Sequence, residues 1–216
     1  MNVALFGGTF DPIHSGHLSA AQAALHSFAL DRILFVPTSV PPHKRNRPLT
    51  PFAHRYAMVA LACAQAPQFH PSLLEAAAGP GGEPNYSIAT VRQAAAALSP
   101  QDRLYFLIGA DAFLEIAEWH ESSALLDACD FIIVSRPGFS IREIEKVIPP
   151  EMYGGPCPDN CVCLRRTKLH LLTSVEANVS SSAIRRLAAE GQPLRGLVPD
   201  AVADYIQKLG LFLDEH

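Results

Sequence analysis

Short apolar runs alternate with longer alanine-rich segments through most of the chain. The runs are rich in Val, Ile, Leu and Phe, and they occupy residues 2–6, 32–37, 103–109 and 130–136. Continuous apolar runs of this length are typical of strands that are buried on both faces of a sheet. The segments between them space their apolar residues along one helical face. This order predicts an α/β protein with a doubly wound, Rossmann-like parallel sheet and right-handed crossovers.

Helices are expected between these strands and after them. The first begins near Ser15, and the others cover residues 51–66, 87–98 and 112–128. A weaker strand at 169–174 is followed by a serine-capped helix that ends at Gly191. A last helix begins near Pro199 and ends at Gly210. The C-terminal part of the chain is therefore expected to be helical.

The length and composition fit a single domain. With 216 residues and 49% hydrophobic content, the chain can bury one sizeable core. We expect one domain over 1–216, with a Rossmann-like core at 1–178 and a helical part at 179–216. Two stretches, 37–51 and 148–166, fit no helix or strand, and loops of that length in a compact domain are usually functional or disordered.

The charge balance excludes two classes of partner. A formal net charge of -4 and a pI near 6.1 disfavour a nucleic-acid duplex or an anionic membrane, since both select basic surfaces. The sequence shows neither a secretory leader pattern nor an apolar run of bilayer length. Five cysteines do not form the framework of a secreted disulfide-rich protein. We expect a cytoplasmic protein, and a homo-oligomer stays open.

The stretch FGGTFDPIHSGHL at 6–18 carries the strongest chemical signal. Gly7 and Gly8 follow the first strand at its carboxyl end, where open α/β sheets bind ligands. Glycines there admit a bulky ligand to main-chain N–H groups, and a helix start near Ser15 points its positive end at the same space. The stretch matches neither the P-loop nor the dinucleotide fingerprint. It therefore predicts a phosphate pocket of another kind.

Two histidines stand three residues apart at the start of that helix. His14 and His17 fall on one helical face, where each ring can donate a hydrogen bond to a phosphate oxygen. A bound polyphosphate favours the protonated imidazole, so the pair can stabilise negative charge that builds up in a transition state. A single histidine would more often be a satisfied surface residue, but the pairing beside Gly7 and Gly8 favours function.

The stretch GGTFDPIHSGHL resembles the signature of the HxGH nucleotidylyltransferase superfamily. More narrowly, the chain resembles the bacterial nicotinate-nucleotide adenylyltransferases. The similarity runs nearly end to end, through PPHK at 41–44, PNYSIAT at 84–90, GADAFLEIAEWH at 109–120, RPG at 136–138, VSSSAIR at 179–185 and the closing LVPDAVADYIQKLGLF. The resemblance implies transfer of AMP from ATP to nicotinate mononucleotide in NAD biosynthesis, with release of pyrophosphate and with Mg²⁺ bridging the ATP phosphates.

The resemblance also implies a set of site residues. The catalytic residues would be His14, His17, Lys44 and Arg185. The ATP-binding residues would be Gly7, Gly8, Thr9, Phe10, His14, His17, Gly109, Asp111, Arg136, Ser181, Ser182 and Arg185. The acceptor-binding residues would be Lys44, Tyr86, Ser87, Thr90 and Trp119. A phosphate acceptor is largely a dianion at neutral pH, so the reaction requires no strong general base. No residue is assigned to a protein metal site.

The sequence departs from the family pattern at several places. Ser87 stands where the family usually has Thr, and Ala89 stands where it usually has Asp. Ser182 replaces a Thr and keeps the hydroxyl. The cysteines of GGPCPDNCVC, Cys157, Cys161 and Cys163, have no family counterpart that we recognise. Their spacing is compatible with free thiols, a disulfide or zinc, and we expect a surface loop with free or occasionally oxidised thiols.

Other functions stay open on sequence grounds. A relative that uses nicotinamide mononucleotide or phosphopantetheine shares the histidine and serine motifs. A non-catalytic nucleotide sensor shares the fold and would bind ATP without forming product. The motif residues expected for chemistry are all present, which favours the enzyme. Helix N–H donors prefer an anion, which favours nicotinate over nicotinamide.

Overall fold

The protein is built on one mostly parallel sheet. The computed structural model describes residues 1–41, 49–76, 84–135, 138–155, 157, 160–173 and 179–213. Within them the strands are β1 (Asn2–Gly8), β2 (Arg32–Pro37), β3 (Phe69–Pro71), β4 (Arg103–Gly109), β5 (Asp130–Val134), β6 (Tyr153–Gly155), β7 (Cys161–Leu164) and β8 (Lys168–Leu172). Their order is β3-β2-β1-β4-β5-β8-β7-β6. The pairs from β3 to β8 are parallel, and only β7 and β6 add on antiparallel. The expected doubly wound sheet is confirmed.

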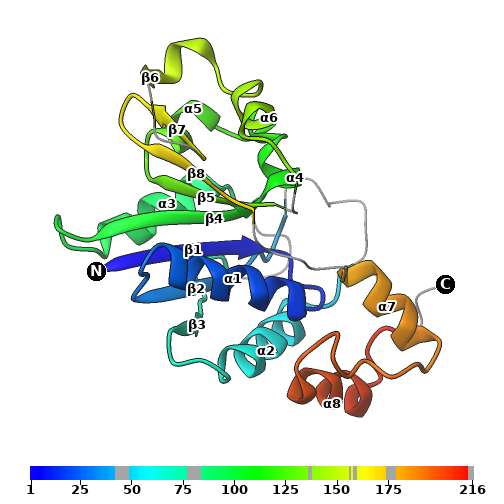
Figure 1. Ribbon diagram of the computed structural model, residues 1–216. Helices are drawn as coiled ribbons and strands as arrows, with labels where there is room; N and C mark the ends of the chain where they lie inside the picture. The colour runs from blue at the N-terminus through cyan, green and yellow to red at the C-terminus, as the bar shows by residue number, and fades with distance from the viewer. Residues whose placement is uncertain are drawn as a thin grey trace.

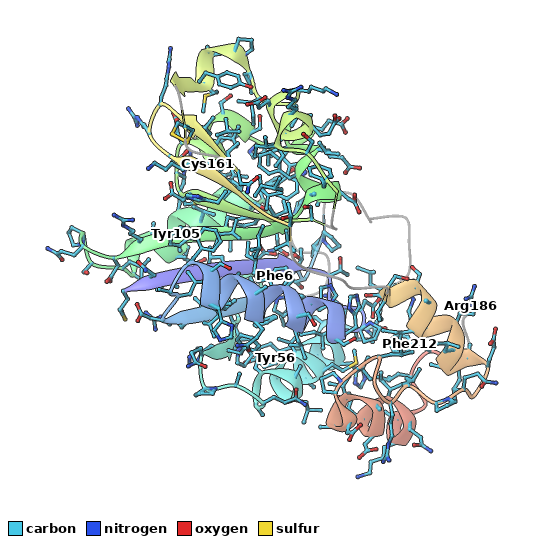
Figure 2. The ribbon with its side chains drawn as sticks, in the orientation of Figure 1. Phe6, Tyr56, Tyr105, Cys161, Arg186 and Phe212 are labelled. Atoms are coloured by element: carbon cyan, nitrogen blue, oxygen red, sulfur yellow. A yellow bond between two sulfur atoms is a disulfide. The ribbon has the colours of Figure 1, made fainter. Side chains whose placement is uncertain are left out.

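Helices cover both faces of this sheet (Figure 1). They are α1 (Ser15–Ser27), α2 (Phe52–Cys63), α3 (Ser87–Ala96), α4 (Ala110–Phe113), α5 (Ser122–Leu126), α6 (Ile141–Glu145), α7 (Ser181–Ala189) and α8 (Asp200–Leu209), with 3-10 turns η2 (Ile116–Glu118) and η3 (Pro150–Met152). The helices α1, α2, α7 and α8 share one hydrophobic core with the sheet, and α3, α5 and α6 share the other. Figure 2 shows side chains filling the space between these layers.

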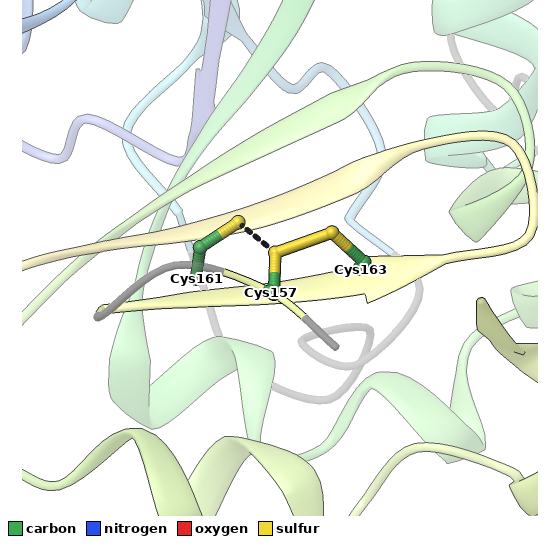
Figure 3. A group of neighbouring side chains, drawn as sticks. All are labelled: Cys157, Cys161 and Cys163. Carbon is green, nitrogen blue, oxygen red and sulfur yellow. Dashed lines mark hydrogen bonds between the residues drawn. A yellow bond between two sulfur atoms is a disulfide. The ribbon is translucent and has the colours of Figure 1, made fainter. Parts of the chain in front are cut away.

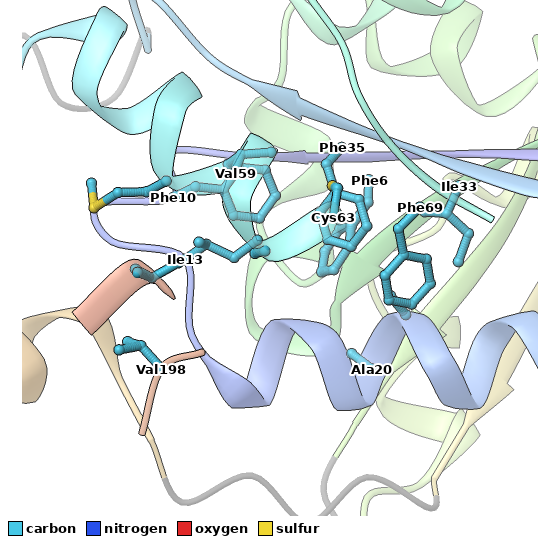
Figure 4. Close-up of a cluster of buried hydrophobic side chains, with 14 of the residues drawn as sticks. Phe6, Phe10, Ile13, Ala20, Ile33, Phe35, Val59, Cys63, Phe69 and Val198 are labelled. Carbon is cyan, nitrogen blue, oxygen red and sulfur yellow. The ribbon is translucent and has the colours of Figure 1, made fainter. Parts of the chain in front are cut away.

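The central strands feed both cores because successive side chains point to opposite faces. In β1, Ala4 and Phe6 belong to the core under α1 and α2, whereas Leu5 belongs to the core under α3. This double burial explains the continuous apolar runs in the sequence. Figure 4 shows Phe6, Phe35 and Phe69 gathered with residues of α1 and α2 in the first of these cores.

The C-terminal helices end as the sequence predicts. The side chain of Ser180 caps α7 by accepting a hydrogen bond from the Ala183 N–H group. Gly191 follows α7 with a left-handed φ of 66°. Gly210 ends α8 with φ 60°, a conformation that glycine adopts without steric cost. Among the described helices none is long and apolar enough to cross a membrane.

The helix expected at 112–128 is wrong. The chain instead forms α4, the turn η2 and α5. Trp119 has an extended backbone with ψ 147°, and Glu121 takes the left-handed conformation with φ 50°. Neither conformation continues an α-helix. The Trp119 ring packs edge-on against Phe106 of β4, so tertiary packing overrides the helical periodicity of this segment.

The loop expected at 148–166 is also wrong in part, because it contains η3, β6 and β7. In β7, Val162 and Leu164 are buried, while Cys161 and Cys163 are half-buried. This alternation is the period of a strand with one buried face, and the Gly- and Pro-rich flanks obscured it. Cys157 and Cys163 form a disulfide, and the free Cys161 sulfur lies 2.8 Å from that of Cys157 (Figure 3).

Candidate active site

A cavity of about 970 Å³ opens at the carboxyl ends of β1 and β4. The chain winds from β1 outward to β2 and β3, then crosses back to β4 and winds the other way. The two neighbouring strands β1 and β4 therefore flank the switch point of the sheet, where open α/β sheets bind ligands. A cavity of this size suits a nucleotide-sized ligand.

The cavity wall unites most of the residues that the sequence singled out. It contains Gly7, Gly8, Thr9, His14, His17, Tyr86, Ser87, Gly109, Asp111 and Trp119. Five of the expected residues are described but lie outside the wall: Phe10, Thr90, Ser181, Ser182 and Arg185. Lys44 and Arg136 fall outside the described residues. The roles assigned to all of these residues stay predictions.

The glycines at the end of β1 lie close to aromatic rings. A Cβ atom on Gly8 would come within 3.0 Å of the Phe10 ring, whereas one on Gly7 would meet Phe106 at an ordinary 3.5 Å. Phe10 itself takes a left-handed backbone with φ 49°. Its ring is buried and contacts the His17 ring edge-on, with centroids 5.0 Å apart. Phe10 therefore supports a site residue from the core instead of lining the cavity.

The two histidines are stacked against each other at the start of α1. Their ring centroids are 3.7 Å apart with an interplanar angle of 23°. The His14 N–H group donates to Nδ1 of His17 at 3.2 Å. Since Nδ1 accepts a hydrogen bond, the neutral ring carries its proton on Nε2. The fold thus fixes the tautomer of His17 that presents an Nε2 donor.

His14 is the more buried of the pair. Its side chain is 8% exposed, and its buried Nδ1 atom has no hydrogen-bond partner among the described residues. Burial lowers the pKa of His14 from 6.5 to about 4, because the charged imidazolium loses hydration that nothing replaces. His14 is therefore neutral at pH 7 in the ligand-free site. A bound polyphosphate would raise this pKa by stabilising the imidazolium.

The first turn of α1 adds a backbone donor to the site. The Ser15 N–H group donates to the Leu197 carbonyl, and the His17 N–H group donates to the His14 carbonyl. The N–H group between them belongs to Gly16, which lies in the cavity wall. An N–H group at a helix N-terminus attracts phosphate oxygens. Gly16 leaves room for such a ligand because it has no side chain.

A buried arginine holds the loops around this site together. Arg55 of α2 is 1% exposed. Its guanidinium donates to the carbonyl oxygens of Thr9, Thr38 and Thr50 at 2.7 to 2.8 Å. These carbonyls belong to the segments that follow β1 and β2 and that precede α2. The sequence analysis missed Arg55, since nothing local distinguishes an arginine in an amphipathic helix from a surface one.

The wall on the β4 side carries polar and aromatic groups. Gly109 ends β4, and Asp111 stands in the first turn of α4. Trp119 is half-buried in the wall. Tyr86 and His120 stack face to face with centroids 4.2 Å apart, and both line the cavity. This region offers flat surfaces for a heterocyclic ring.

The N-terminus of α3 faces the same region. Its N-cap residue Tyr86 makes no side-chain capping bond, and Ser87 opens the helix in the cavity wall. Thr90 is buried one turn further in, and its hydroxyl donates to Oε1 of Glu75 at 2.7 Å. Thr90 therefore does not line the cavity, although it was expected to bind the acceptor. Glu75 does line it, and the sequence analysis missed it.

The serines and the arginine of α7 bind the histidine loop from outside the cavity. The Ser181 hydroxyl donates to the Pro12 carbonyl at 3.0 Å. Arg185 is buried and donates from Nη1 to the Asp11 carbonyl at 2.8 Å and from Nη2 to the Ser182 hydroxyl at 3.4 Å. In this structure Ser181 and Arg185 hold residues 11–12 against α7, directly before His14, and Ser182 contacts Arg185.

Comparisons with known proteins show the family of the chain. A family model described as cytidylyltransferase-like matches residues 5–187. A protein of Symbiobacterium thermophilum, named a probable nicotinate-nucleotide adenylyltransferase, is 44% identical over 98% of this chain and 95% of its own. One of the same name from Thermus thermophilus is 40% identical over 98% of this chain and 100% of its own. The chain belongs to the cytidylyltransferase-like family, and within it to the group that these relatives represent.

Solved structures support the fold. The Plasmodium falciparum nicotinic acid mononucleotide adenylyltransferase in complex with APC superposes with a TM-score of 0.72 at 20% identity, covering 98% of this chain and 96% of that one. The same protein in complex with NaAD gives a TM-score of 0.71 at 21% identity. At this identity the likeness concerns the fold alone.

Proposed function

We propose that this protein transfers the adenylyl group of ATP to nicotinate mononucleotide. An oxygen of the acceptor phosphate attacks the α-phosphorus of ATP, the bond from that phosphorus to the bridging oxygen breaks, and pyrophosphate leaves. The products are nicotinate adenine dinucleotide and pyrophosphate. The observation that carries this proposal is the stacked pair His14 and His17 at a helix N-terminus, in the wall of the same cavity as a second helix N-terminus and Trp119.

The ATP phosphates would lie between Gly8 and the start of α1. There the Gly16 N–H group and the Nε2 donor of His17 offer hydrogen bonds to phosphate oxygens. Asp111, in the first turn of α4 directly after β4, would accept a hydrogen bond from a ribose hydroxyl, as carboxylates near this edge do in related sheets. The ATP site would thus span the switch point between β1 and β4.

The acceptor would occupy the side of the cavity formed by Tyr86, Ser87 and Trp119. A pyridine ring can stack on an aromatic side chain, and an uncapped helix N-terminus favours a carboxylate. Both features stand together here. They fit nicotinate mononucleotide better than an acceptor with an aliphatic chain such as phosphopantetheine.

Catalysis would depend on positioning and on charge stabilisation. The acceptor phosphate is largely a dianion at neutral pH and is itself the nucleophile. The bases in the described part of the cavity wall are His14, His17 and His120, beside the acids Glu75, Asp111, Glu115 and Glu118. Negative charge builds up on the pyrophosphate as it leaves. Protonated imidazoles beside it would therefore stabilise the transition state more than the ground state.

Magnesium would arrive bound to ATP. In the described residues the one group of three or more potential metal ligands is the cysteine trio on β7 and its flank. Two of these sulfurs are joined in a disulfide, and sulfur is not a ligand that Mg²⁺ prefers. Mg²⁺ commonly keeps waters and binds through substrate phosphates with few protein ligands. We therefore propose that the phosphates supply most of its ligands, and that the ion neutralises charge on them.

The activity is tested by supplying ATP and Mg²⁺ with one acceptor at a time and measuring pyrophosphate. We expect turnover with nicotinate mononucleotide. Turnover with phosphopantetheine alone would replace this proposal by the related enzyme. ATP binding without product in every mixture would support a nucleotide sensor instead.

His17→Ala tests the catalytic role of the histidine pair. We expect kcat to fall by roughly 100-fold or more, the usual effect of removing one transition-state donor, with a smaller change in ATP affinity. His26→Ala is the matched control, because His26 is exposed near the other end of the same helix and should leave kcat unchanged. A His17→Ala variant with near-normal kcat would exclude His17 from the transition state.

A further inference from the structure

Glu75 is a buried acid in the cavity wall that the proposed mechanism leaves without a role. It lies shortly after β3, and its side chain is 6% exposed. One carboxyl oxygen, Oε1, accepts a hydrogen bond of 2.7 Å from the Thr90 hydroxyl. The other oxygen, Oε2, is buried and has no hydrogen-bond partner among the described residues. A buried oxygen without a partner is costly in the empty protein.

The surroundings of Glu75 favour its neutral form. No described lysine, arginine or histidine forms an ion pair with it. Burial raises the pKa of Glu75, and the hydrogen bond from Thr90 to Oε1 and the nearby Thr38 hydroxyl oppose this shift. A protonated carboxyl group can donate a hydrogen bond, whereas an ionised one can only accept.

Thr90 fixes the position of this carboxyl group relative to α3. The Thr90 hydroxyl lies 2.7 Å from Oε1 of Glu75 and 3.5 Å from the carbonyl oxygen of Tyr86, the N-cap residue of α3. The Glu75 carboxyl group therefore stands beside the first turn of the helix, where Tyr86 and Ser87 line the cavity. The uncapped N-terminus of α3 and the Glu75 carboxyl group, with its unpartnered Oε2, therefore lie together at one end of the cavity.

We propose that Glu75 is a specificity-determining residue for the acceptor, in which the neutral carboxyl group donates a hydrogen bond from Oε2 to the carboxylate of the pyridine ring. This inference rests on the proposed function. Protonated Glu75 and the N–H groups of α3 would hold the nicotinate carboxylate together. Ionised Glu75 would repel that carboxylate and favour an uncharged amide in its place.

The proposal predicts a pH dependence of acceptor preference. Below the raised pKa of Glu75 the acid is protonated and favours nicotinate; as the pH rises through that pKa the donor is lost and repulsion replaces it. Other titratable groups line the same cavity, namely His14, His17, Tyr86, Asp111, Glu115, Glu118 and His120. Effects on the chemistry and on the common phosphate cancel when the two acceptors are compared as a ratio at each pH. His120 stacks on Tyr86 at the acceptor end and can act on the ratio itself, so the Glu75 contribution is the part of the pH dependence that Glu75→Gln removes.

The experiment measures kcat/KM for nicotinate mononucleotide and for nicotinamide mononucleotide from about pH 5 to about pH 9, a range that spans raised carboxyl pKa values. In the wild type we expect the ratio to fall by roughly tenfold or more as the pH rises, the size expected for one hydrogen bond to a charged group. Glu75→Gln keeps the shape and an amide donor but cannot ionise. It should hold the low-pH ratio throughout.

The control is Glu118→Gln, the same substitution at an exposed carboxylate of the cavity wall, which should keep the wild-type pH dependence. A purely structural Glu75 would move kcat/KM for both acceptors equally. A pH-independent ratio in the wild type, or an unchanged pH dependence in Glu75→Gln, would overturn the inference, and the first of these outcomes does not depend on the folding of the variant. Turnover with neither mononucleotide would overturn the proposed function instead.

Discussion

At the scale of single residues, His14 combines two opposed requirements. Its burial beside His17 keeps it neutral in the empty site, and the pKa is lowered to about 4. Binding of a polyphosphate requires a hydrogen-bond donor at His14, and the binding is stronger when the imidazole is protonated and positively charged. ATP binding at pH 7 should therefore be accompanied by proton uptake at this site, because the ligand supplies the negative charge that the empty protein lacks.

The lowered pKa of His14 predicts acid sensitivity of the fold. In the unfolded chain His14 titrates near 6.5, so between pH 6.5 and pH 4 the unfolded state binds more protons than the folded state and stability falls as the pH falls. Between pH 7.5 and pH 5 this should cost about 2 kcal/mol. Urea unfolding at the two pH values measures it.

His14→Gln provides the comparison for that measurement, since glutamine does not titrate. The variant should lose less stability than the wild type over the same pH interval, whatever its stability at pH 7.5. His170 is half-buried and also has a lowered pKa, so part of the acid sensitivity should survive. Equal losses in both proteins would show that His14 is not buried as the structure has it.

The sequence was most informative where neighbouring residues act together. Gly7, Gly8, His14 and His17 lie within one turn and its helix, so their proximity in space follows from the chain itself. Arg55 and Glu75 could not be recognised in this way. Each gains its position from partners on other elements, Arg55 from carbonyls on three segments and Glu75 from Thr90 of α3.

At the scale of elements, the interrupted segment from α4 to α5 is the clearest failure of periodicity. In a continuous helix over 112–128, the side chains of Trp119 and His120 would point in directions set by the helical periodicity. The break after η2 leaves both side chains in the cavity wall, with His120 against Tyr86. Local propensity favours a helix here, and packing against β4 and α3 outweighs it. Elements far from the site, such as α8 with its terminal Gly210, followed their sequence signals closely.

The hairpin of β6 and β7 gives a prediction about thiols. Without reductant, the denatured protein should react with a thiol reagent at Cys63, Cys129 and Cys161 only, because Cys157 and Cys163 are joined. After reduction all five cysteines of the chain should react. The measurement is thiol titration in denaturant, before and after reduction.

A Cys157→Ser variant serves as the control for this count. It should show four reactive thiols without reductant, since Cys163 loses its partner. Five thiols in the unreduced wild type would contradict the disulfide. Zinc that co-purifies with the protein, and that is lost in the same variant, would favour the metal site that the sequence left open.

At the scale of the whole molecule, substrate binding should stabilise the fold. The cavity joins the ends of β1 and β4 with the first turns of α1 and α3, so a ligand there bridges both halves of the sheet. At 100 times its Kd, ATP with Mg²⁺ should add about 2.7 kcal/mol, which corresponds to a rise in Tm of roughly 5 to 10 °C for a chain of this length.

Thermal unfolding with and without Mg-ATP measures that rise. The matched ligand is Mg²⁺ with free triphosphate, which should give a smaller shift because it lacks the adenosine that we propose binds beside β4. An unchanged Tm at a saturating concentration of ATP would contradict the assignment of this cavity to the nucleotide.

The two ends of the sheet bear on how copies of the chain can associate. The outermost strands, β3 and β6, have three residues each, and short border strands offer few free backbone groups to another chain. Joining two sheets into one continuous sheet is therefore disfavoured at both borders. If the protein forms a homo-oligomer, we expect its subunits to meet through helical surfaces and not by extension of the sheet.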